Sequence, residues 1–110
     1  MAELDEILQT IERLESALDD LAVRGLRSAG PQDLASLDAL REEFERIGAG
    51  HLAGRIAAVI TGIRNDDRGA AATLLRARAS LRVFERVLTL EVAEGVLGSM
   101  GVPDEGEDDA

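Results

Sequence analysis

The stretch from residue 70 to residue 97 constrains the fold most, because it is the longest uninterrupted helical pattern and the most apolar one. Successive helix residues lie about 100° apart, and at that spacing the large apolar side chains fill an arc about 200° wide. A surface helix usually shows an apolar stripe little wider than about 100°. We therefore expect this helix to be covered from two sides, within a bundle or in part by a second subunit. The candidate interaction residues on the arc are Val83, Phe84, Val87, Leu90, Glu91 and Glu94.

Two of these residues, Glu91 and Glu94, are acids inside an otherwise apolar arc. A buried carboxylate without a partner is strongly unfavourable. We expect each to pair with an arginine across the bundle or a dimer interface, or to reach solvent where the helix end frays.

Three further helices are expected, at residues 3–27, 31–47 and 51–65. Pro31 stands at a favoured first helical position, and glycine-containing breaks separate the later segments. The first helix carries a heptad seam, which fits one helix of an antiparallel bundle, with an intermolecular coiled coil as the alternative. The seam consists of Leu4, Ile7, Ile11, Leu14, Leu18 and Leu21. Together with the helix at 70–97, these segments predict an all-α four-helix bundle.

The length of 110 residues leaves room for one domain, which we place at residues 1–100. Residues 101–110 carry five acids and lose the helical period, so we expect a disordered acidic tail. The chain has two phenylalanines and no tryptophan or tyrosine. Its core must therefore be mainly aliphatic, which suits helix packing.

The net charge of −10 is the main guide to partners. Phosphate backbones and anionic lipids repel an acidic protein, so neither a nucleic acid nor a membrane is expected as a partner. The chain has no cysteine, which excludes disulfides and thiolate metal sites. Its acidic start differs from the basic start of a signal peptide, and we expect a cytoplasmic protein.

A row of small residues at spacings of four lies in the third helix: Gly50, Gly54, Ala58 and Gly62. Each glycine costs a helix about 1 kcal/mol relative to alanine, so three in one row call for a packing reason. We expect another helix to pack closely there, within the fold or in a dimer. The alternative is an accident of a composition rich in glycine and alanine.

Three arginines, Arg78, Arg82 and Arg86, form a ladder on the last helix. Like charges four residues apart repel one another, so an anion should lie nearby. It can be an acid of the same chain, on the first helix or in the tail. The other possibilities are an anionic ligand and an acidic partner protein.

No catalytic or metal-binding spacing is visible. The single histidine, His51, follows a glycine-rich break and lacks the companions of a metal site, and no cofactor is expected. The sequence favours a non-enzymatic interaction module, such as an adaptor or regulator that forms a homodimer. The alternative is a small enzyme or anion-binding bundle that uses the arginine ladder with Glu91 or Glu94. A pocket lined by those charges would favour the alternative, and a continuous exposed apolar face would favour the interaction module.

Overall fold

Four α-helices and one 3-10 turn make up residues 2–99, the part of the chain that the computed structural model describes. The predicted all-α four-helix class is confirmed. The predicted tail, residues 101–110, lies outside the described residues. The elements in chain order are α1 (Ala2–Arg24), η1 (Leu26–Ser28), α2 (Pro31–Arg46), α3 (Gly50–Arg64) and α4 (Ala70–Ser99).

A residue with positive φ lies just after each of the first three α-helices. Helix α1 stops three residues earlier than predicted, because Gly25 adopts a φ of 93°, and its N–H donates to the Leu21 carbonyl at 2.8 Å. Gly48, with a φ of 87°, similarly follows α2. Asp66 lies two residues after the end of α3, as Gly48 lies two residues after the end of α2, and it has a φ of 49°. Aspartate tolerates this conformation better than most non-glycine residues.

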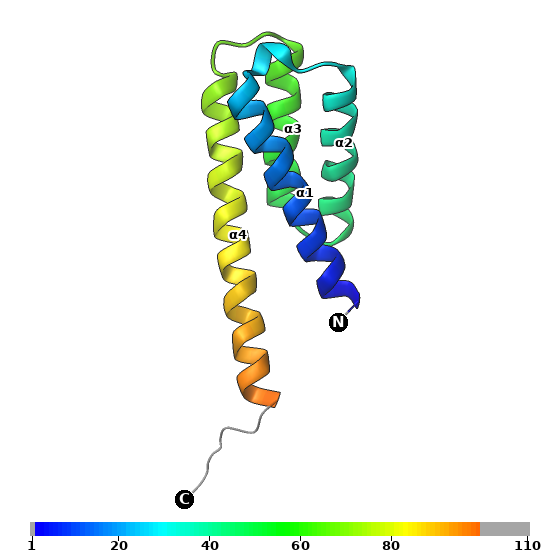
Figure 1. The fold of residues 1–110 in the computed structure, drawn as a ribbon, viewed down its shortest axis with the longest axis vertical. Helices are drawn as coiled ribbons and strands as arrows, with labels where there is room; N and C mark the ends of the chain where they lie inside the picture. The colour runs from blue at the N-terminus through cyan, green and yellow to red at the C-terminus, as the bar shows by residue number, and fades with distance from the viewer. Residues whose placement is uncertain (1, 100–110) are drawn as a thin grey trace, which may run out of the picture.

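Helix α3 lies between α2 and α4, and α1 crosses them obliquely (Figure 1). All four helices contribute to one aliphatic core. The seam of α1 faces inward, as predicted for a bundle helix, and α4 contributes residues at spacings of 4, 3 and 4. The buried residues of these two helices are Ile11, Leu14, Leu18 and Leu21 of α1, and Ala70, Leu74, Ala77 and Leu81 of α4.

The two phenylalanines close the core at the far end from η1. Phe44 of α2 is fully buried, and Phe84 of α4 meets it edge to face, with ring centroids 6.2 Å apart and an interplanar angle of 81°. Such pairs contribute about 1 kcal/mol beyond the area they bury. This contact ties α2 to the middle of α4.

Helix α4 continues well past the ends of α2 and α3 (Figure 1). Its inward-facing seam runs through Leu81, Phe84 and Leu88, and the next two seam positions are Glu91 and Gly95. Both of these residues are exposed. The bundle therefore stops covering α4 where its seam stops being apolar.

The expectation that α4 is covered from two sides within the bundle is wrong. Within residues 2–99, the bundle covers only the half of the arc that contains Leu81, Phe84 and Leu88. The other half is open, and cover by a second subunit stays a prediction. Among the described residues, no helix combines the length and apolar character needed to cross a membrane.

Candidate functional site

The open half of the α4 arc is the main candidate for an interaction surface. Val83, Val87 and Leu90 lie on it at spacings of four and three, with 62%, 48% and 58% of their surface exposed. We call these three residues the outer strip. Phe84, the fourth apolar residue predicted for an interaction surface, instead packs against the core. Single exposed aliphatic side chains are common, but three on one helix face form a continuous apolar surface.

Glu91 and Glu94 follow the outer strip on the part of α4 beyond the bundle. Both are exposed, and within residues 2–99 neither forms an ion pair with an arginine. The predicted pairing within the bundle is therefore wrong, and both acids reach solvent, which was the other expected outcome. Pairing with a second subunit stays a prediction.

The row of small residues on α3 splits into two parts. Gly62 is buried, and a Cβ added to it would lie 3.2 Å from the Cβ of Ala70, where α4 begins. Gly50, Gly54 and Ala58 are exposed, and nothing lies within 4 Å of a Cβ added to either of those glycines. Close packing within the fold therefore holds for Gly62 alone, and the prediction is wrong for the other three residues. Packing against a second subunit stays untested.

The arginine ladder meets the acids of α1 at one of its three positions. The Arg78 guanidinium donates to Asp19 Oδ1 at 2.7 Å, so this cation has a partner within its own chain. Arg82 lines a small cavity of about 110 Å³ together with Arg78, Glu15 and Asp19. Neither Glu91 nor Glu94 lines that cavity. The ladder and the two acids therefore do not form one pocket in the described structure.

A carboxyl pair that the helical periods did not reveal lies beside this cavity. Burial raises the pKa of Glu15 above its ordinary value of 4.5, and a hydrogen bond with Glu85 of α4 raises it further. The negative charges of Glu85, Asp19 and Glu12 act in the same direction. Since the two carboxyls lie on different helices, only the crossing of α1 and α4 brings them together.

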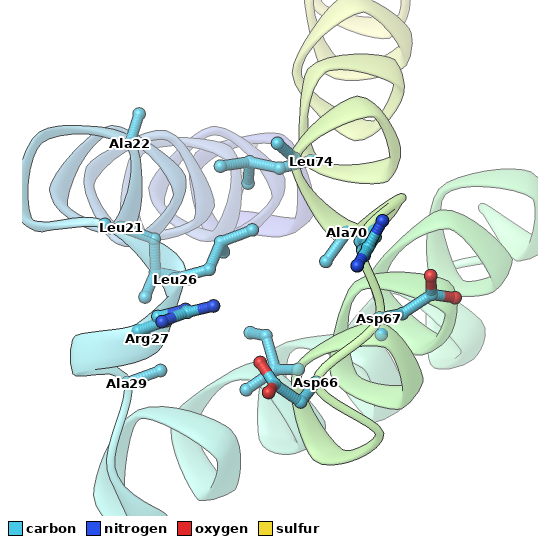
Figure 2. A pocket seen from close by; sticks show the side chains of 14 residues that line it. Leu21, Ala22, Leu26, Arg27, Ala29, Asp66, Asp67, Ala70 and Leu74 are labelled. Atoms are coloured by element: carbon cyan, nitrogen blue, oxygen red, sulfur yellow. The ribbon is translucent and has the colours of Figure 1, made fainter.

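A pocket of about 680 Å³ lies between η1 and the turn that joins α3 to α4. In Figure 2, Leu26 and Leu74 point into it from opposite sides, Arg27 reaches toward it, and the Asp67 side chain turns away. A volume of this size is typical of ligand sites. Its lining has no hydroxyl, imidazole or amine side chain, and its charged groups are the carboxylates of Asp66 and Asp67 and the guanidinium groups of Arg27 and Arg68.

The residues that the structure describes hold no group of three or more histidine, aspartate or glutamate side chains that could bind a metal ion. His51 is exposed in the first turn of α3. Among the described residues, the outer strip is a candidate with one consistent chemistry, because its three exposed side chains are all aliphatic.

No protein-family model, no curated protein and no solved structure matches this chain at a significant level.

Proposed function

We propose that this protein is a non-enzymatic interaction module, an adaptor or regulator, which forms a homodimer through the outer strip of α4. The observation that supports the proposal is the exposure of Val83, Val87 and Leu90 on a helix that extends beyond its own bundle. Each half-exposed aliphatic side chain gains about 1 kcal/mol when it is covered. Two copies would cover six such side chains at once.

A homodimer is the simplest partner for this surface. Symmetric dimers are the commonest assemblies of soluble proteins, and they bring two copies of one patch together. The acidic residues near the end of α4, and the net charge of −10, disfavour nucleic acids and anionic membranes as partners. A cytoplasmic location is part of this proposal.

The alternative activity, an enzyme or anion-binding site built on the arginine ladder, has less support. Arg78 is already paired with Asp19, and Glu91 and Glu94 lie away from the cavity beside the ladder.

Sedimentation equilibrium of the wild-type chain at micromolar concentration tests the proposal, and we expect a monomer–dimer equilibrium. Val87→Glu should shift that equilibrium toward the monomer, because it places a charge in the middle of the apolar interface. Circular dichroism of the variant should still report a folded helical protein.

Val23→Glu provides the matched control. Val23 is 87% exposed on α1, away from the outer strip, so the same substitution there should leave the association unchanged. A wild-type protein that remains monomeric up to hundreds of micromolar while fully helical would refute self-association.

A further inference from the structure

The outer strip is flanked by two exposed charges of opposite sign. Arg76 lies before it and Glu94 after it, and neither has an ion-pair partner within residues 2–99. The series Arg76, Val83, Val87, Glu94 has spacings of 7, 4 and 7, and it is therefore symmetric about Glu85. Seven- and four-residue steps keep all four residues on one face of a helix.

Resting on the proposed homodimer, we propose that two copies pair antiparallel along α4, with the two-fold axis near Glu85. Arg76 of one copy then faces Glu94 of the other, and Val83 faces Val87. Both ends of the surface are neutralised by this arrangement. Parallel pairing would instead place Arg76 beside a second Arg76 and Glu94 beside a second Glu94, which is unfavourable.

The neighbouring positions fit the same register. A two-fold axis near Glu85 places Leu90 opposite Ser80 of the second copy, and the neighbouring Ala79 is exposed and small enough to leave room for the leucine. Glu91 lies one residue, about 1.5 Å along the helix axis, from the point opposite Ser80, so the Ser80 hydroxyl can donate a hydrogen bond to its carboxylate. The antiparallel register therefore gives every polar residue that interrupts the α4 arc a partner of suitable chemistry.

The extent of α4 also agrees with this axis. The helix runs from Ala70 to Ser99, so Glu85 lies at its middle, and two antiparallel copies overlap along their whole length. The part of α4 that extends past its own bundle is then covered by the first half of the second α4. A second copy thus supplies the cover that the chain itself does not provide.

Engineered disulfides test the orientation, since the natural chain has no cysteine. Ser80→Cys and Glu91→Cys leave the outer strip intact, and oxidising a mixture of the two single variants should give a disulfide between one copy of each. A disulfide requires Cα atoms closer than about 7 Å. In the antiparallel register two copies of Ser80→Cys are about 15 Å apart along the helix, so this variant alone should not cross-link.

The possible outcomes separate the orientation from the association itself. A Ser80→Cys homodimer would show parallel pairing, and it would overturn the antiparallel register while leaving the homodimer in place. No disulfide from a mixture that sediments as a dimer would place the interface elsewhere. No association at all would refute the proposed function as well. Ser36→Cys on α2 is the control for random collision, and it should not cross-link with Glu91→Cys.

Charge exchange gives a second, independent readout. Arg76→Glu and Glu94→Arg should each weaken the homodimer, roughly tenfold, since each turns two ion pairs into like-charge contacts. The double variant should regain wild-type association, because it restores both pairs with exchanged signs. Equal association of all four proteins would overturn the proposed register.

Discussion

Gly54→Ala tests the structural assignment of the α3 surface. Gly54 lies inside a helix that spans residues 50–64, its surface is exposed, and an added Cβ meets nothing within 4 Å. The new methyl group therefore has room, and it reduces the conformational freedom that the unfolded chain loses on folding.

The expected size of this effect follows from helix propensity. Alanine is favoured over glycine by about 1 kcal/mol in a helix interior. For a domain of this size, 1 kcal/mol corresponds to a rise in melting temperature of roughly 4–8 °C. We therefore expect Gly54→Ala to raise the free energy of unfolding by about 1 kcal/mol in urea titrations followed by circular dichroism.

Gly62→Ala is the matched comparison on the same helix. Its added Cβ would lie 3.2 Å from the Cβ of Ala70 and 3.5 Å from the Ala70 Cα. This tight contact opposes the gain in helix propensity, so Gly62→Ala should gain less than Gly54→Ala or destabilise the fold. A loss of stability in Gly54→Ala would refute the reasoning, and a loss that grows with protein concentration would identify the exposed row as an interface.

Three further predictions concern charge and the end of the chain. The pKa of Glu15 is raised in the folded protein, so the protonated carboxyl stabilises the fold below pH 4.5, and this stabilisation is lost as the pH rises through the folded pKa. Glu15→Gln should therefore raise the free energy of unfolding at pH 7 but not at pH 3. The pKa of Asp33 is lowered, chiefly because the Gly30 N–H donates to its carboxylate at 2.8 Å. Asp33→Asn should therefore lower the free energy of unfolding at pH 7, and the variant and the wild type should become equally stable as acid protonates Asp33. Deleting residues 101–110 should change the free energy of unfolding by less than about 1 kcal/mol, and a larger loss in a thermal melt would show that this segment binds the folded domain.

The helices could be predicted because each carries its apolar residues at a regular helical spacing. Leu14, Leu18 and Leu21 illustrate this, since their spacing alone places them on one face and the structure buries all three. The end of α1 was harder to predict from the sequence, because it depends on the positive φ of Gly25. A glycine within a helical pattern can continue the helix or end it, and local spacing does not decide between the two.

The width of the α4 arc was visible in the sequence, but its division into a covered and an open half was not. That division depends on where α2 and α3 end in space. The sequence did carry one sign of where the cover ends, since Glu91 and Gly95 follow Leu88 in the inward-facing seam of α4. The carboxyl pair of Glu15 and Glu85 depends on the crossing of two helices and has no counterpart in local spacing.

The extension of α4 beyond the bundle implies two levels of local stability within one continuous helix. Backbone amides from Ala70 to Leu88 belong to a segment held by the core, and they should exchange with deuterium only as the whole domain opens. The amides from residue 89 to residue 99 belong to a segment too short to form a stable helix in isolation. Hydrogen exchange along α4 should therefore show a step near Leu88 in dilute solution. If a second copy covers residues 89–99, their protection from exchange should rise with protein concentration. Hydrogen exchange along α4 would then measure the association of the two copies directly.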